Sequence, residues 1–203
     1  MRALTAALLL LAFVSAPALA AESYESLAAK ARAGEAGVDF AQLRALYAQS
    51  RAFNPYGTVI TAATAAMRKA AAEDNCAETM KAAALVFQAN PADIEAHYAA
   101  ALCHKGHGDP ARALYHEEAF KQLLAALLAS GDGKSPQTAI KVISPGEEYF
   151  ALSMLGLEPK DQALVQTDGK LYDLFTVISE KTGERAEIFF DVSLPTATLR
   201  KGS

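Results

Sequence analysis

The chain of 203 residues has no tryptophan, only two cysteines and no strong excess of charge of either sign. Its 19 Lys and Arg residues are slightly outnumbered by 23 Asp and Glu residues, so the basic surface that nucleic-acid binding needs is missing. After the first twenty residues, no apolar run reaches the roughly 20 residues of a membrane-spanning helix. We therefore expect neither a nucleic-acid partner nor membrane insertion of the mature chain.

The first twenty residues have the pattern of a secretory signal peptide. Arg2 supplies a positive charge, an apolar run extends from Leu4 to Val14, and Ala18-Leu19-Ala20 has the small residues that signal peptidase recognises. The pattern predicts cleavage after Ala20 and a mature protein that is periplasmic or secreted. Because those compartments are oxidising, the cysteines are first considered as a disulfide.

Cys76 and Cys103 are predicted to form that disulfide. Asn90-Pro91 has the pattern of a turn between two antiparallel helices, with Pro at a first helical position. The cysteines lie at similar distances on either side of this turn. A rise of about 1.5 Å per residue therefore places them at the same height, at the open end of the hairpin. Two free thiols or a metal site are the alternatives.

The spacing of apolar residues changes near Gly131. Residues 21–130 are rich in Ala and have helical spacing, with helices expected at 23–32, 40–51, 56–72, 76–89, 92–105 and 110–129. Residues 131–195 are expected to share the same core and to contain strands at 138–143, 162–166, 171–179 and 185–193 and a helix at 147–157. The polar residues 196–203 are expected to form a flexible tail.

From Ile94 onward the chain resembles one tetratricopeptide unit of about 34 residues. His97 takes the position of a large aromatic residue, Ala100 and Ala101 take small packing positions, and Gly108-Asp109 forms the turn. A generic Ala-rich helical bundle is the alternative. The sequence predicts an α+β fold in which N-terminal tetratricopeptide-like helical hairpins precede a small antiparallel β-meander with one helix.

Several short motifs occur in a characteristic order along the mature chain. They are FNPY at 53–56, SGDG at 130–133, TAIKVI at 138–143 followed by Glu148-Tyr149, LGL at 155–157, Tyr172-Asp173 and FFDV at 189–192. In this order they resemble the bacterial family called domain of unknown function 4919. The resemblance implies an exported protein of about this length and assigns no activity.

Acidic residues of the C-terminal half are the candidates for catalysis. Glu148, Asp132, Asp173 and Asp191 would form an acid–base site if they converged in one cleft, as in a hydrolase acting on a cell-envelope polysaccharide. The simpler interpretation is that Glu148 stabilises the first turn of a helix and that Asp132 belongs to a turn that ends one. A calcium site at Asp132 would need six or more oxygen ligands.

The histidines near Cys103 suggest a metal site only weakly. His104 and His107 have a spacing that would allow chelation, with His116 or Glu117 as a third ligand. An exposed turn between helices explains the same residues, and the disulfide already uses Cys103. We predict no metal and no cofactor.

Binding of a protein or peptide partner is the preferred function, because the repeat-like helices would offer a concave surface and no catalytic set is convincing. The candidate binding residues are Tyr56, Glu95, His97, His104, Asp132 and Glu148. The alternatives are the cell-envelope hydrolase described above and an immunity- or inhibitor-type partner of a secreted toxin.

Overall fold

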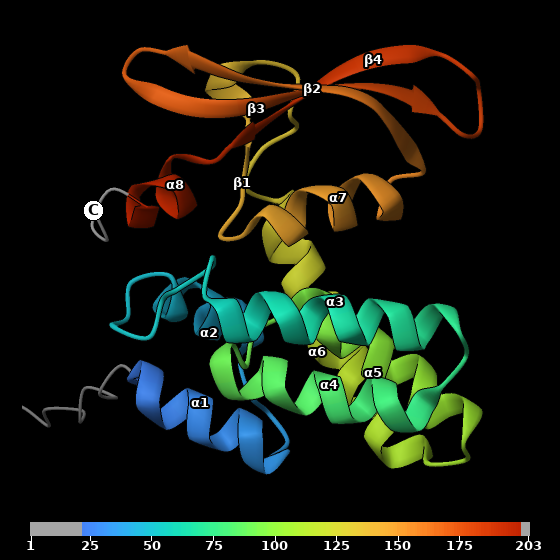
Figure 1. The fold of residues 1–203 in the computed structure, drawn as a ribbon. Coiled ribbons are helices and arrows are strands. Elements are labelled where there is room, and N and C mark those ends of the chain that lie inside the picture. Colours follow the sequence, from blue (N-terminus) through green and yellow to red (C-terminus); the bar gives the residue numbers. More distant parts are fainter. Residues whose placement is uncertain (1–21, 200–203) are drawn as a thin grey trace, which may run out of the picture.

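Six helices make up the N-terminal part of the chain in the computed structural model, which describes residues 22–199 (Figure 1). They are α1 (Tyr24–Ala33), α2 (Phe40–Tyr47), α3 (Thr58–Ala72), α4 (Cys76–Ala89), α5 (Ile94–Gly106) and α6 (Pro110–Leu128). Helices α5 and α6 form the hairpin expected from Ile94 onward, α4 packs against α5 across the predicted turn at Asn90-Pro91, and α3 and α4 form a further hairpin. The expected signal peptide, residues 1–20, lies outside the described residues.

Short polar side chains fix where these helices begin. The side chains of Ser23, Asp39, Asn75, Asp93 and Asp109 each accept a hydrogen bond from the backbone N–H three residues further on. Such caps satisfy N–H groups that have no partner within the helix, and each contributes about 1 kcal/mol. The helix starts can therefore be read from the sequence.

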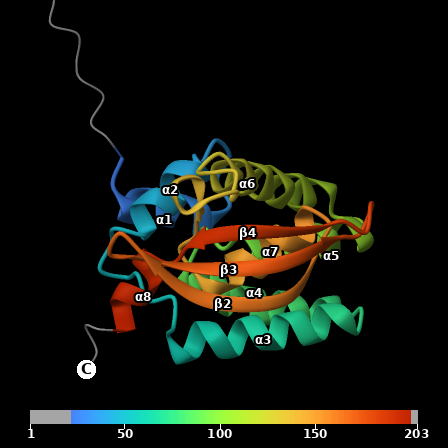
Figure 2. The ribbon, with the colours of Figure 1, turned by 90° about the horizontal axis from the view of Figure 1, so that it is seen from above.

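A four-stranded sheet covers one side of the helical part (Figure 2). Strands β2 (Leu157–Thr167), β3 (Lys170–Ser179) and β4 (Arg185–Asp191) form the predicted antiparallel meander. The short β1 (Ile140–Lys141) pairs with β4 in parallel, so the sheet is mixed and its order is β1-β4-β3-β2. Helix α7 (Pro145–Met154) lies between the sheet and the helical layer, and α8 (Ser193–Leu199) follows β4 (Figure 1).

The structure corrects several expected boundaries. The helices expected at 40–51 and 147–157 end earlier, at Tyr47 and Met154. The strand expected at 138–143 is reduced to two residues, because Pro136–Thr138 forms a 3-10 turn, η1, capped by Ser135. Strand β2 begins at Leu157 instead of 162, since Gly156 with φ of 65° ends the preceding helix and turns the chain at once. The tail expected after Pro195 starts inside α8.

The main apolar core contains residues from both halves of the chain. Leu123 and Leu127 of α6 belong to the same buried cluster as Phe150 of α7 and Phe175 and Phe190 of the sheet. A second, smaller cluster joins α3, α4 and α5. Helix α7 is therefore fixed by the core through Phe150 and its buried neighbours, and other residues of the helix line surface hollows.

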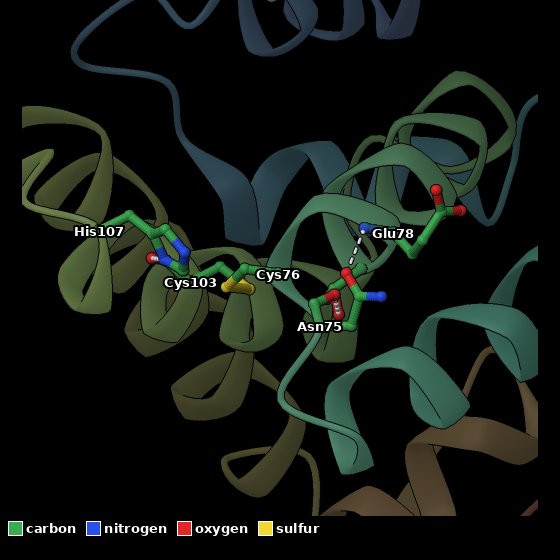
Figure 3. The surroundings of a disulfide bond; sticks show 6 residues. Asn75, Cys76, Glu78, Cys103 and His107 are labelled. Atoms are coloured by element: carbon green, nitrogen blue, oxygen red, sulfur yellow. Dashed lines mark hydrogen bonds between the residues drawn. A yellow bond between two sulfur atoms is a disulfide. The ribbon is translucent and has the colours of Figure 1, made fainter.

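The predicted disulfide between Cys76 and Cys103 is present, with Cα atoms 5.4 Å apart (Figure 3). It joins the first residue of α4 to the last turn of α5, at the end of this helix pair that lies away from the Asn90-Pro91 turn. Asn75 caps α4 by accepting from the Glu78 N–H at 3.2 Å, and Nδ1 of His107 lies 3.0 Å from the Cys103 carbonyl oxygen. Both helix ends are thus fixed where the bridge forms.

None of the helices within residues 22–199 combines the length and the hydropathy that a membrane span requires.

Candidate functional site

A groove runs between α3 and α5 on one side and α7 on the other. Its first hollow, of about 270 Å³, is bounded by α3, the α4–α5 turn and the start of α7. Its second hollow, of about 380 Å³, continues along α5 and α7 and is lined mainly by Met67, Leu102, Tyr149 and Phe150. Arg68 and Glu95 line both hollows, so the two adjoin; we call them together the α3–α7 groove.

The Arg68–Glu95 ion pair marks the junction of the two hollows. Nε and Nη2 of Arg68 each lie 2.6 Å from one carboxylate oxygen of Glu95, and the Arg68 side chain is still 49% exposed. Across the groove, a Cβ added to Gly146 would lie 3.3 Å from Nη2 of Arg68. A side chain at this position would therefore crowd the Arg68 guanidinium.

The first hollow is acidic. Burial raises the pKa of Asp93 to about 7, and the nearby charges of Glu95 and Glu147 add to this rise. One oxygen of Asp93 accepts from the Ala96 N–H at 2.9 Å, which partly offsets the burial. Tyr56 lines the same hollow. A cationic group entering here would favour the ionised form of this carboxyl and would lie beside an aromatic ring.

A buried ion pair holds the wall of the groove at the N-terminus of α7. Glu147 is 4% exposed, and its two oxygens accept from Nε and Nη2 of Arg44 at 2.8 and 2.6 Å. The Ile143 N–H donates to Glu147 at 2.8 Å, and Arg44 also donates to the Lys141 carbonyl at 3.0 Å. This network joins α2, the end of β1 and α7 at one point.

Behind the groove, Glu148 and Asp173 form a carboxyl pair. Glu148 is 1% exposed. Burial is the largest cause, and the charge of the neighbouring Asp173 the next, of a pKa raised to about 9. Oε2 of Glu148 has no hydrogen-bond partner among the described residues. Asp173 also accepts from Nε2 of Gln162 at 2.8 Å, and the Tyr149 hydroxyl donates to the same glutamine.

The protonated state of Glu148 gives a pH prediction. Between pH 7 and 9 the folded protein keeps a proton that the unfolded chain has already released, so its stability should fall as the pH rises. The expected slope is up to about 1.4 kcal/mol per pH unit. The pKa values of His97 and His116 are lowered to about 3 and 4. These histidines make the stability rise with pH, but only below about pH 6.5, where the unfolded chain protonates them.

Urea denaturation at several pH values would measure this slope, and Glu148→Gln should remove it. Glu187→Gln, the same change at an exposed strand residue, is the matched control and should leave the slope unchanged. A wild-type stability that stays constant between pH 7 and 9 would contradict a protonated Glu148.

The structure separates the acidic candidates. Glu148 and Asp173 come together, whereas Asp132 accepts from the Lys134 N–H in its own turn and pairs with the Lys134 side chain at 3.6 Å. Asp191 caps the start of α8 through the Ser193 N–H at 3.0 Å. The four carboxyls therefore do not share one cleft.

The candidates on α5 also separate. Glu95 lines the α3–α7 groove, but His97 and His104 face the opposite side of α5, because they lie about half a turn away around the helix. They therefore do not form one binding surface with Glu95. Of the other candidates, Tyr56 lines the groove and Glu148 lies behind it. Within residues 22–199, no three His, Cys, Asp or Glu side chains are arranged to hold a metal ion.

The groove residues Arg68, Asp93, Gly146 and Leu102 and the buried Arg44 were not candidates from the sequence. Capping patterns identify Asp93 as a helix start, but nothing local indicates that it lines a hollow together with the start of α7. Arg44 and Glu147 are 103 residues apart, so no spacing rule connects them.

These features define a protein in which helical hairpins support a small sheet and a connecting helix closes a groove against them. The model of the family described as domain of unknown function (DUF4919) matches residues 36–200, and the chain belongs to this family. This confirms the resemblance seen in the short motifs. No curated protein and no solved structure matched the chain.

Proposed function

We propose that this protein is an exported binding module that holds an extended segment of a partner protein in the α3–α7 groove, in the periplasm or outside the cell. The observation that carries the proposal is the junction of an acidic hollow and an apolar hollow at the Arg68–Glu95 pair. Two adjoining hollows suit successive side chains of one peptide better than a single small molecule.

The lining of each hollow determines which side chain it accepts. Glu95 is already paired with Arg68, so the carboxyl of Asp93 and the ring of Tyr56 favour the ammonium or guanidinium group of a basic residue in the first hollow. Leu102, which is 53% exposed, and Tyr149, which is 46% exposed, favour an apolar residue in the second. The partner segment should therefore carry a Lys or Arg close to an apolar residue.

Selection from a displayed library of random peptides on immobilised residues 21–203 would test this preference. Enriched peptides should carry Lys or Arg near an apolar residue, and their affinity can then be measured by fluorescence anisotropy. Leu102→Glu, which places a charge in the apolar hollow, and Gly146→Leu, which narrows the junction, should each weaken binding about tenfold or more.

Leu85→Glu is the matched control, since Leu85 is a similarly exposed leucine on α4 that lines neither hollow. Peptides that bind Leu102→Glu and Gly146→Leu as tightly as the wild-type protein would place the binding surface elsewhere. A selection without enrichment of basic residues would contradict the role of the acidic hollow.

The affinity of a basic peptide should also depend on pH. Because the pKa of Asp93 is about 7 and a cation favours the ionised carboxylate, binding should tighten as the pH rises from 6 to 8. Asp93→Asn should bind more weakly at pH 8 and lose this dependence. Asn is as good a helix cap as Asp, so α5 should remain folded in the variant. Equal pH dependence of binding in the wild-type protein and in Asp93→Asn would show that Asp93 is not the group whose ionisation controls the affinity.

The two alternative functions have less support. A hydrolase would need carboxyls that reach a substrate, and Glu148, which has the most strongly raised pKa of the acidic candidates, is 1% exposed. An inhibitor of a secreted toxin would bind through a surface of the same kind, and copurification with the toxin would distinguish it.

A further inference from the structure

Three histidines and two arginines meet in a cavity of about 470 Å³ on the side of α5 away from the groove. The histidines are His97, His104 and His116, and the arginines are Arg32 and Arg112. Among the described residues that line the cavity, none is acidic, although acids outnumber bases in the whole chain. The cavity therefore differs in charge from the rest of the protein.

Hydrogen bonding sets the tautomers of two of these rings. Nε2 of His97 lies 3.1 Å from the Pro91 carbonyl oxygen, which can only accept, so this nitrogen carries the proton. His97 is 2% exposed and burial lowers its pKa to about 3, so the ring is neutral and its Nδ1 accepts. The donor is Nδ1–H of His116, at 2.9 Å. A neutral His116 then keeps the lone pair of its Nε2.

The wall of the cavity is a row of nearly parallel rings. His116 lies between Phe87, at a centroid distance of 5.5 Å and an angle of 11°, and His104, at 5.6 Å and 2°. Parallel imidazoles do not direct their nitrogens at one common point, so the row does not suit a single metal ion. It offers a flat surface against which a planar or apolar group can pack.

The two arginines supply more positive charge than the cavity can balance. Arg32 donates to the carbonyls of Phe87 and Gln88, at 3.4 and 3.0 Å, and these uncharged partners leave its charge uncompensated. Nε of Arg112 lies 3.5 Å from Asp109, whose carboxylate is also 3.8 Å from Nδ1 of His104. The Asp109 carboxylate thus faces one guanidinium group, that of Arg112, and one histidine, His104.

We propose that this cavity binds a small organic carboxylate, with its charge toward Arg32 and Arg112 and its apolar body against the Phe87–His116–His104 row. Guanidinium groups match the planar geometry of a carboxylate, which accepts their N–H hydrogen bonds. The site shares no lining residue with the α3–α7 groove and does not depend on the function proposed for it.

Titration with benzoate, followed through the imidazole ¹⁵N resonances, would test the assignment. Saturable shifts of the His116 and His104 signals are expected, while benzyl alcohol, the neutral analogue, should give none. Arg112→Gln should weaken benzoate binding about tenfold without unfolding the protein, because the Arg112 side chain is 73% exposed. Arg51→Gln, at an exposed arginine outside the cavity, is the control.

Three results would overturn the proposal. They are an absence of saturable shifts with benzoate, equal shifts with benzyl alcohol, and unchanged benzoate affinity in both Arg112→Gln and Arg32→Gln. Phosphate that binds more tightly than benzoate would overturn the assignment to carboxylates. Peptide binding at the groove is measured separately, so failure of one proposal leaves the other intact.

Discussion

Replacing Glu147 with Gln is expected to lower the free energy of unfolding by about 3–5 kcal/mol. The substitution keeps the shape of the side chain but leaves the guanidinium of Arg44, whose side chain is 11% exposed, without its counter-charge. A buried charge that loses its partner keeps the full cost of its desolvation. Urea denaturation followed by circular dichroism would measure the change.

Two further variants test whether the loss of stability in Glu147→Gln comes from the unpaired charge of Arg44. Glu148→Gln changes the neighbouring residue, which is already protonated at pH 7, so it should cost much less than Glu147→Gln at that pH. Arg44→Met combined with Glu147→Leu should recover much of the lost stability, because two apolar residues leave no buried charge. If Glu147→Gln costs less than about 1 kcal/mol, the ion pair does not hold α7 in the way we describe.

The loss should extend to the groove, because Glu147 holds the first turn of α7, where Gly146 faces Arg68. The basic peptides selected on the wild-type protein should therefore bind Glu147→Gln more weakly, even under conditions in which the variant is folded. The Arg44→Met/Glu147→Leu protein tests whether the position of α7, rather than the charge of Glu147, determines this affinity.

Local pattern predicted the helices well because capping and periodicity are local properties. Helix α4 has the predicted bounds, 76–89, since Asn75 caps its start and Asn90-Pro91 ends it. Strand β1 and helix α8 depend on distant partners instead. Ile140 and Lys141 form a strand only because β4 lies beside them, and the Ser193 side chain accepts from the Leu171 N–H.

The same distinction applies to the candidate site. Helical periodicity alone separates Glu95 from His97 and His104, so their placement on opposite faces of α5 was available from the sequence. The acidity of the first hollow was not. It arises where Asp93, at the start of α5, meets the first turn of α7, and the relative position of those two helices depends on the shared core.

Loss of the Cys76–Cys103 disulfide is expected to lower the free energy of unfolding by about 3–4 kcal/mol, because the bridge closes a segment with a sequence separation of 27 residues. The double variant Cys76→Ala/Cys103→Ala should be destabilised to a similar extent and, unlike the wild-type protein, should not respond to reductant. Thermal unfolding with and without dithiothreitol would measure both effects. Equal stability of the oxidised and reduced wild-type protein would contradict the prediction.

The position of the bridge makes its effect on binding separable from its effect on stability. It joins α4 and α5 at their open end, next to Leu102 of the second hollow, whereas the first hollow of the α3–α7 groove is lined by Asn90 and Asp93 at the closed end of the same hairpin. Reduction well below the unfolding temperature should therefore leave the preference for a basic residue in the first hollow unchanged. If reduction of the disulfide removes this preference, the two ends of the α4–α5 pair are coupled. The first hollow would then depend on the oxidised state of the protein.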